Sequence, residues 1–350
     1  MTRREWIGAA AGSVPLLLSH PAAQAAGAAI PGLGGAPASF GLEIRAARAA
    51  DPHADFLDVC HNLQLNGCET RLASYDREAV RALRERAERY RLRVILDTPL
   101  PRGESDVARF DGAVQACKEA GAVSLHAAMT DRRYEAFDTF DAFRRDFARC
   151  QQSVALAEPV LRKHRIRLGI ENHKGWRSAE QAAWLKRLSS EWVGVHFDFG
   201  NNLSLCEDPE DTFRNLSPYA IACHIKDMAV EPYSDGFLLS EVPLGDGILD
   251  LARWVAALRQ RDPQIPFDSE TITRDPLKIP VFTEKYWATF DDSFSPLPGR
   301  DLARVLEIVH RNPPRKPLPR TSGLSAAEQT RLETENNRLS IRYAREKLGL

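Results

Sequence analysis

Short β-rich runs alternate with amphipathic helical stretches along most of this 350-residue chain. Eight runs have the length and composition of strands, and helical periodicity follows most of them. The strands are expected at 40–45, 64–70, 93–99, 122–128, 166–172, 193–200, 220–228 and 265–273. The main helices are expected at 78–90, 108–120, 138–164, 178–188, 208–217 and 250–260. Such alternation indicates parallel strands joined by crossover helices.

Eight strand–helix units over about 230 residues match the count and size of a (β/α)8 TIM barrel. A doubly wound open sheet is the alternative, but it predicts a glycine-rich turn after the first strand, and none follows "FGLEIR". We therefore expect an α/β barrel domain over residues 38–310. Within the chain, 281–299 is expected to be a long loop or lid. A C-terminal helical extension, made of a Pro-rich linker and a helix, is expected over 311–350.

The tail helix, expected over 325–347, carries few apolar residues. It either packs peripherally or contacts a neighbouring chain, so the sequence leaves a homo-oligomer open.

The first 29 residues have the pattern of an export signal rather than of a folded element. Arg3 and Arg4 precede a short apolar run, and small residues follow, with Ala23-Gln24-Ala25 as a candidate cleavage site. The paired arginines resemble a twin-arginine signal. We therefore expect residues 1–29 to be read by the twin-arginine export machinery and the protein to be periplasmic or secreted. No other run has the length and apolar character of a membrane span, so none is expected in the mature form.

The charge balance argues against nucleic acid as a partner. The chain has 47 basic and 48 acidic residues, a formal net charge of −1, so it offers no broad basic field. The six cysteines show no C-x-x-C spacing, which argues against a thiolate metal site. We expect mostly buried free thiols and a small-molecule substrate.

Four of the later strands end in residues that ligate metals. These residues are Glu171, Asp198, His224 and Glu270. In a parallel barrel all strand C-termini emerge at one face, where barrel enzymes hold their active sites. Three carboxylates and one imidazole form an oxygen-rich ligand set, which favours Mn²⁺ or Mg²⁺, with Co²⁺ or Zn²⁺ as alternatives. The sequence therefore predicts a divalent metal site at the mouth of the barrel.

Other polar residues near these strand ends are candidates for substrate contacts. His126 ends the fourth strand, while His173 and Trp176 follow Glu171; each is alternatively a structural residue or loop anchor. His196 shares the strand face of Asp198, and Lys226 shares that of His224. His196 is alternatively a buried spacer, and Lys226 a salt-bridge partner of Asp227.

Taken in order, several motifs resemble the xylose-isomerase-like TIM-barrel superfamily, and most closely its sugar phosphate isomerase/epimerase and inosose dehydratase group. They are "GIENH", "HFDFGN", "CHIKD", "PLGDGILD" and "DSET", and the resemblance covers residues 40 to 275. It implies that Glu171, Asp198, His224 and Glu270 hold the metal. It also implies that Glu171 and Glu270 act as acid and base on a sugar or polyol.

The chain also departs from the ketose epimerases of that group. They carry a histidine three residues after the metal-binding Asp, where this chain has Asn201, a further candidate for substrate binding. They carry an arginine soon after the metal-binding His, where this chain has "IKDM".

We therefore expect an isomerase or epimerase that abstracts a proton next to a carbonyl, acting on an oxidised sugar, keto-glycoside or inosose-like polyol. The alternatives are a dehydratase on the same metal site and a non-catalytic periplasmic sugar-binding protein. An endonuclease-IV-like phosphodiesterase is disfavoured by Asn201 and by the balanced charge.

Overall fold

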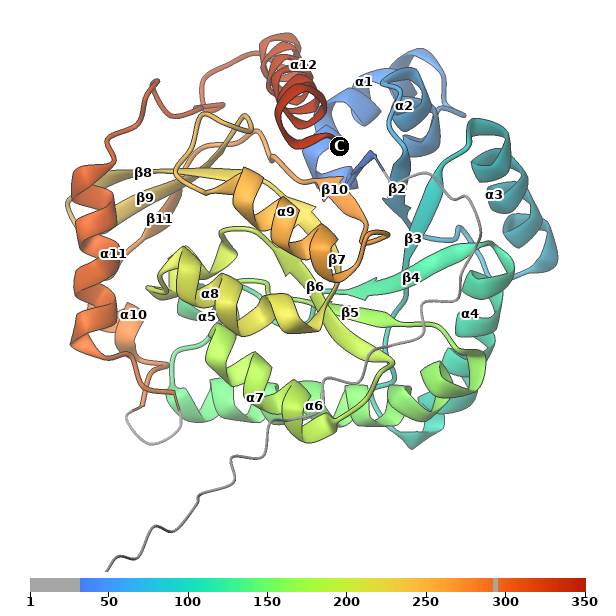
Figure 1. Ribbon diagram of the computed structural model, residues 1–350, viewed down its shortest axis with the longest axis horizontal. Helices are drawn as coiled ribbons and strands as arrows, with labels where there is room; N and C mark the ends of the chain where they lie inside the picture. The colour runs from blue at the N-terminus through green and yellow to red at the C-terminus, as the bar shows by residue number, and fades with distance from the viewer. Residues whose placement is uncertain (1–31, 292–294) are drawn as a thin grey trace, which may run out of the picture. The chain divides into compact units, whose positions relative to one another are not determined.

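The protein is described here by a computed structural model covering residues 32–291 and 295–350. The expected export signal lies outside these residues. Eight parallel strands close a barrel in the order β1-β10-β7-β6-β5-β4-β3-β2 (Figure 1). Their bounds are β1 Leu33–Gly35, β2 Gly67–Thr70, β3 Arg93–Asp97, β4 Ala122–Ala127, β5 Leu168–Glu171, β6 Val193–Asp198, β7 Ala220–Ile225 and β10 Phe267–Ser269. The predicted (β/α)8 barrel is confirmed.

Helices surround the barrel strands (Figure 1). Their bounds are α1 Gly41–Ala50, α2 Phe56–Asn62, α3 Arg77–Tyr90, α4 Val107–Glu119, α5 Arg133–Ala136, α6 Phe140–His164, α7 Ser178–Leu188, α8 Pro209–Leu216, α9 Leu251–Arg261, α10 Glu284–Trp287, α11 Gly299–Arg311 and α12 Ala326–Tyr343. Short 3-10 turns lie at η1 Pro37–Phe40, η2 Glu104–Asp106, η3 Asn201–Leu205 and η4 Ser217–Tyr219, and a π turn, η5 Ala344–Leu348, ends the chain.

The first predicted strand was wrong, because residues 40–45 are helical. The first barrel strand is the short segment "LGG" at Leu33–Gly35, which has no hydrophobic alternation to reveal it. Gly34 allows the close packing there, since a Cβ at this position would lie 1.8 Å from a carboxylate oxygen of Asp268. The helix that replaces the predicted strand begins where the Glu333 carboxylate accepts hydrogen bonds from the backbone N–H groups of Leu42 and Glu43, both at 2.8 Å.

The long connection after β7 contributes two strands to a small antiparallel sheet, whose third strand follows β10. The sheet consists of β8 Asp227–Tyr233, β9 Gly236–Val242 and β11 Leu277–Ile279, in the order β11-β9-β8. The Asp227 carboxylate accepts hydrogen bonds from the backbone N–H groups of Met228, Gly245, Gly247 and Leu249, at 2.9 to 3.1 Å. Asp227 therefore fixes the two ends of this connection to each other.

The aromatic-rich segment after β11 is held against the barrel domain by its buried side chains. Tyr286 in α10 is fully buried, and its hydroxyl donates a hydrogen bond to the backbone carbonyl of Ser204 at 2.9 Å. The guanidinium of Arg133, which lies in α5, is fully buried and donates hydrogen bonds to Thr289 and Ser295. The described part of this segment is thus anchored to the domain.

Helix α12 packs beside α1 and closes the ring of helices (Figure 1). The side-chain amide of Asn337 donates to the carbonyl of Ser39 at 2.8 Å, and the hydroxyl of Ser340 accepts from the backbone N–H of Leu244 at 3.2 Å. Ile341, and Leu348 just beyond the helix, join the main hydrophobic core. The C-terminal segment therefore packs on the same compact unit, Pro31–Leu350, as the barrel.

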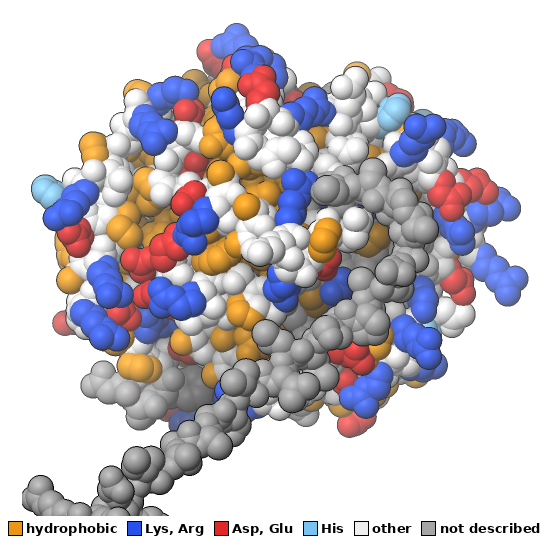
Figure 2. All heavy atoms as spheres, in the orientation of Figure 1, with side chains coloured by type: hydrophobic (Ala, Val, Ile, Leu, Met, Phe, Trp, Pro, Cys, Tyr) orange, Lys and Arg blue, Asp and Glu red, His pale blue; other side chains and the backbone are white. Residues whose placement is uncertain are grey.

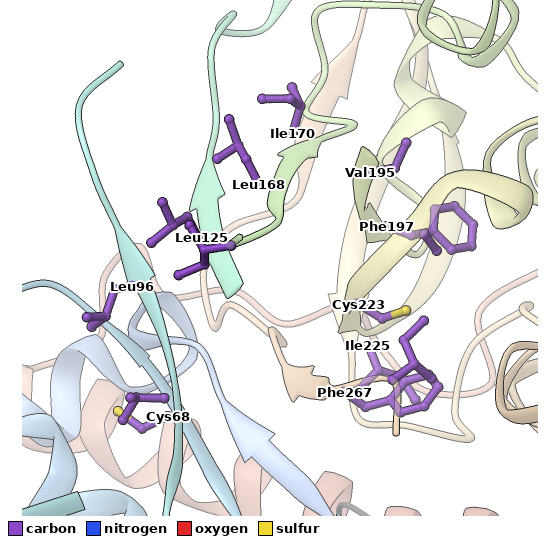
Figure 3. Close-up of a cluster of buried hydrophobic side chains, with 14 of the residues drawn as sticks. Cys68, Leu96, Leu125, Leu168, Ile170, Val195, Phe197, Cys223, Ile225 and Phe267 are labelled. Carbon is purple, nitrogen blue, oxygen red and sulfur yellow. The ribbon is translucent and has the colours of Figure 1, made fainter. Parts of the chain in front are cut away.

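The main hydrophobic core lies between the strands and the helices. Figure 3 labels side chains of this core that come from the barrel strands, among them Leu125, Ile170 and Phe197. Each of these three side chains is fully buried. Because successive strand residues face opposite sides, the residues that follow each of them face the barrel interior.

Among the described residues, all six cysteines are free and buried, as predicted. None of the helices in the described ranges combines the length and apolar character that crossing a membrane requires. Figure 2 shows acidic and basic side chains intermingled on one face of the molecule.

Candidate metal centre at the mouth of the barrel

The inward faces of the strands carry polar side chains where the outward faces carry apolar ones. Glu171 follows Ile170, Asp198 follows Phe197, and His224 follows Cys223. In the β6–β7 pair Asp198 lies directly opposite His224. Glu270 lies just beyond the end of β10, and its backbone N–H bonds to the carbonyl of Ile225 at 3.0 Å. Parallel strands in register thus bring these four residues to one end of the barrel.

The four predicted ligands converge on one point. One ligand atom from each of Glu171, Asp198, His224 and Glu270 lies within 4.8 Å of all the others. All four residues are buried, with exposed fractions from 0% for Asp198 to 9% for Glu270. A buried group of three carboxylates and an imidazole has the donor chemistry of a divalent cation site.

The hydrogen bonding within this group also fits a cation. Among the described residues, Oδ1 of Asp198 and Nδ1 of His224 have no hydrogen-bond partner, whereas Oδ2 of Asp198 lies 2.7 Å from the ammonium of Lys226. This Nδ1 atom lies 3.6 Å from Oε2 of Glu270 and 4.0 Å from Oδ2 of Asp198. Buried polar atoms are rarely left unpartnered, because each one costs about 1–3 kcal/mol. A cation between these atoms would satisfy all of them.

Lys226 is the positive charge next to this group. Its Nζ atom lies 2.7 Å from Oδ2 of Asp198 and 2.6 Å from Oε2 of Glu270, and the side chain is fully buried. The alternative pairing considered from the sequence, with Asp227, was wrong, because the Asp227 carboxylate accepts backbone N–H groups. The two carboxylates around this ammonium raise the pKa of Lys226 against the effect of burial.

The surroundings raise the pKa of one carboxylate of the ligand set and lower the pKa values of the other two. Burial, together with the neighbouring Glu270 and Glu171, raises the pKa of Asp198 well above its usual value. Burial acts the same way on Glu270, but Lys226 and His224 outweigh it and lower the pKa of Glu270 to about 2. The hydrogen bond from His126 and the charges of His173 and His224 likewise outweigh burial and hold the pKa of Glu171 well below its usual value. Glu171 and Glu270 are therefore ionised at neutral pH.

A cavity of about 470 Å³ opens beside this group. Among its lining residues are Glu171, Glu270, His173, Lys174, Arg132 and Arg274. Two members of the predicted ligand set thus face a space that can admit a small molecule, and three cationic side chains face the same space.

Of three further residues predicted to contact substrate, the structure places one at the cavity and two away from it. His173 lines the cavity, and its Nδ1 atom lies 3.0 Å from the carbonyl oxygen of Thr130. Trp176 is 3% exposed and packs edge-on against Phe147 and Trp184, which is the position of a loop anchor. His196 is fully buried. The positions of Trp176 and His196 do not support contact with a molecule in the cavity.

His126 and Asn201 contact the ligand set rather than the cavity. The Nδ1 atom of His126 lies 2.8 Å from Oδ1 of Asp97, and its Nε2 atom lies 3.3 Å from Oε2 of Glu171. Asn201 is fully buried, and its amide nitrogen donates to Oε1 of Glu171 at 3.2 Å. Both residues therefore orient the Glu171 carboxylate.

Three residues of the site were missed from the sequence. Lys174 is buried and donates a hydrogen bond to Asn201; burial and the charge of Lys226 lower its pKa to about 8. Arg274 lines the cavity and pairs with Glu241 at 2.6 Å. Glu69 is the next-to-last residue of β2, and its Oε2 atom lies 2.9 Å from Nε2 of His224. Extending the strand-end argument to the weak second strand, "GCET", would have found Glu69.

Comparison with known proteins assigns the chain to a family. The family profile described as "Xylose isomerase-like TIM barrel" matches residues 45–288, more than half of the chain. The chain belongs to this family. Among curated proteins, no sequence matches it.

Several solved structures share this xylose isomerase-like fold. A D-psicose 3-epimerase, solved in the presence of D-fructose, superposes with a TM-score of 0.54 at 16% identity over 85% of this chain and 95% of its own. A Mycobacterium smegmatis member of the same fold, in complex with magnesium, gives 0.52 at 14% identity over 80% and 97%. A probable 3-DHS dehydratase from Bacillus anthracis gives 0.50 at 14% identity over 68% and 91%. At these identities the likeness shows the fold alone.

Proposed function

We propose that the protein is a divalent-metal-dependent isomerase or epimerase of a sugar or polyol, which moves a proton next to a carbonyl group. One observation carries the proposal. Glu171 and Glu270, two carboxylates of a four-residue ligand cluster, line a single cavity of about 470 Å³. That volume is suitable for a small ligand.

The site residues can share the proton transfer. A divalent cation bound there, with Mn²⁺ our first choice, would polarise the substrate carbonyl and favour loss of the neighbouring proton. Because Glu171 and Glu270 are ionised at neutral pH, either carboxylate can accept that proton. Lys226 donates a hydrogen bond to Glu270 at 2.6 Å, which positions this carboxylate and keeps it ionised. Return of the proton to the other face gives an epimer, and return to the adjacent carbon gives an isomer.

Loss of a β-hydroxyl group from the same ionised substrate would make the protein a dehydratase. The buried ammonium of Lys226 favours keeping this second candidate, because it is a fixed cationic hydrogen-bond donor beside Glu270. The paired arginines Arg3 and Arg4, ahead of a short apolar run, support the further proposal that the protein is exported. We therefore favour an oxidised, unphosphorylated sugar or an inosose-like polyol as the substrate.

Incubation with keto-sugars and inososes in D₂O plus Mn²⁺, followed by NMR, tests the proposal. We expect solvent deuterium to enter next to the carbonyl of one substrate class, with a new diastereomer or isomer as product. A product that has lost water would instead assign the dehydratase reaction. Chelation of the metal should abolish either signal.

Two variants assign the exchange to the site. Glu270→Gln should lower the exchange rate at least 100-fold, since general acid–base groups contribute about 10²–10⁴-fold. Glu333→Gln is the matched control, because Glu333 is also buried but belongs to α12, where it contacts the start of α1 and does not line the cavity. If Glu270→Gln exchanges as fast as the parent, Glu270 has no part in proton transfer.

A further inference from the structure

A second group of potential ligands lies inside the barrel, deeper than the first. It consists of Glu69 from β2, His126 from β4, His196 from β6 and His224 from β7. One ligand atom from each lies within 4.8 Å of all the others, and all four side chains are buried. His196 precedes Asp198 by two residues on the same strand face, so it lies one inward layer further from the mouth.

The Glu69 carboxylate is the centre of this deep group. Its Oε2 atom lies 2.9 Å from Nε2 of His224 and 3.8 Å from Nε2 of His196. Its Oε1 atom lies 3.7 Å from Nδ1 of His126. Tetrahedral ligands bonded at about 2.0–2.1 Å to one ion lie roughly 3.3 Å from each other. The three separations measured from Glu69, 2.9, 3.7 and 3.8 Å, therefore lie on both sides of the spacing that a shared ion imposes.

His196 gives an independent reason to expect a ligand here. Its side chain is fully buried, and neither of its ring nitrogens has a hydrogen-bond partner among the described residues. The ring lies between two others, with ring centroids 4.6 Å from His126 and 4.0 Å from His224. An apolar residue would fill this position without the cost of an unpartnered buried nitrogen. An imidazole aimed at a carboxylate from 3.8 Å instead suits a shared cation.

We propose that Glu69, His126, His196 and His224 form a second divalent cation site, distinct from the one at the mouth. Three imidazoles and one carboxylate are a nitrogen-rich set of the kind that binds Zn²⁺ or Co²⁺, whereas the oxygen-rich mouth site suits Mn²⁺ or Mg²⁺. The deep set carries the single negative charge of Glu69. To bind this cation through Nδ1, His126 would exchange its 2.8 Å contact with Asp97 for the ion, while its Nε2 atom stays 3.3 Å from Glu171.

His224 belongs to both groups and connects them. Its Nε2 atom faces Glu69, and its Nδ1 atom faces Asp198 and Glu270. One ring nitrogen of this residue is thus available to each of the two proposed sites. Occupation of the two sites is therefore coupled through one side chain.

Metal content of the full chain tests the proposal without reference to any reaction. Protein saturated with Zn²⁺ and Mn²⁺ and then desalted is analysed by mass spectrometry of the metals. We expect two cations per chain in the parent, one in His196→Phe, which keeps the ring and removes the ligand, and one in Asp198→Asn, which alters the mouth site. Co²⁺ in the deep site should also give strong visible absorption typical of four-coordination, and His196→Phe should abolish it.

A simpler role for Glu69 is to accept a hydrogen bond from His224 and orient it. In that case the parent would hold one cation, His196→Phe would keep it, and the proposal would be overturned. A parent with one cation that His196→Phe loses and Asp198→Asn keeps would establish the deep site and contradict the metal-dependent function proposed for the mouth. Glu69→Gln provides the same comparison if His196→Phe does not fold, and thermal unfolding in chelator checks each variant.

Discussion

Lys226 places an ammonium group between two of the carboxylates that would hold the mouth cation. The contacts to Asp198 and Glu270 are 2.7 and 2.6 Å long, and all three groups are buried. Removing one partner of a buried ion pair typically costs about 3–5 kcal/mol, because the remaining charges lose their compensation. A bound divalent cation would supply that compensation instead.

Lys226→Met should therefore lower the unfolding temperature strongly in chelator and much less in Mn²⁺. The stabilisation produced by Mn²⁺ should be larger in this variant than in the parent, as thermal denaturation with and without the metal would measure. Lys163→Met is the control, since Lys163 is an exposed lysine that pairs with Asp111 on the surface. Equal metal effects in Lys226→Met and parent would show that Lys226 and the cation do not share the carboxylates.

His224 makes the stability of the metal-free protein depend on pH. Burial lowers the pKa of His224, but Glu69 and Glu270 outweigh it and raise the pKa to about 10, from an ordinary value of 6.5. A raised histidine pKa contributes stability that is fully present below pH 6.5 and is lost as the pH rises through 10. In chelator, the free energy of unfolding of the parent, relative to His224→Gln, should fall over this interval.

Mn²⁺ should reverse that trend, because a cation competes with the proton on Nδ1 of His224. The stabilisation by Mn²⁺ should grow with pH between 6.5 and 10, which denaturant unfolding at several pH values would detect. His53→Gln, at an exposed histidine, should keep the pH profile of the parent. A profile for His224→Gln that parallels the parent would mean that another group sets the pH dependence.

At the scale of elements, α12 is joined to α1 by one buried carboxylate. Glu333 accepts hydrogen bonds from the first backbone N–H groups of α1, and burial raises its pKa to about 7. The folded protein therefore binds this proton more tightly than the unfolded chain does. The contribution of this proton to the free energy of unfolding is fully present below about pH 4.5 and is lost as the pH rises through 7.

Glu333→Gln keeps an oxygen that can accept the same hydrogen bonds but removes the proton equilibrium. We expect the variant to gain stability relative to the parent as the pH rises from 4.5 to 8, as measured by denaturant unfolding. Glu335→Gln, an exposed neighbour on the same helix, should follow the parent at every pH. If Glu333→Gln loses stability relative to the parent at pH 8, the charge of Glu333 at the start of α1 stabilises that helix.

The sequence predicted the barrel where elements have strong patterns. The strands β3 to β7 and β10 and the helices α3, α4 and α6 to α9 carry clear patterns, and the four ligand residues at strand ends were found from the strands. The first strand was missed because "LGG" has only three residues and two glycines, while "FGLEIR" alternates like a strand. Its helical state depends on Glu333, which is 291 residues away from Leu42, and no local pattern reveals that contact.

The same reasoning explains which site residues escaped prediction. Lys174 and Arg274 belong to the loops after β5 and β10, where side-chain direction depends on the turn rather than on the pleat of a strand. Conversely, Trp176 was a candidate for substrate contact because it follows Glu171 closely, yet the turn directs it between α6 and α7, as the alternative of a loop anchor predicts. The alternation along a strand predicts which way each side chain points, whereas the direction of a loop side chain depends on tertiary contacts that the sequence does not show.

At the scale of the whole molecule, the C-terminal segment completes the main core. Ile341, Leu348 and Leu350 are buried in it, and each aliphatic side chain contributes roughly 1.5–3 kcal/mol by burial. Their sum is comparable with the total stability of a typical domain, about 5–15 kcal/mol.

A chain that ends at residue 320 should therefore lose cooperative unfolding at 25 °C and expose apolar surface, as circular dichroism and dye binding would report. Arg331→Ala, at an exposed position of α12, should change the unfolding free energy by less than about 0.5 kcal/mol. A truncated chain with the parent's unfolding transition would show that α12 contributes little to the domain.

One face of each barrel strand contributes to stability and the other to the barrel interior. This division affects which substitutions the chain can accept. Residues that face the helices hold the molecule together, whereas the residues between them face the barrel interior. A substitution at an inward position can alter which ion or substrate is accepted while the outer packing stays intact. New chemistry can thus arise in this architecture through changes at a handful of alternate positions, without a new fold.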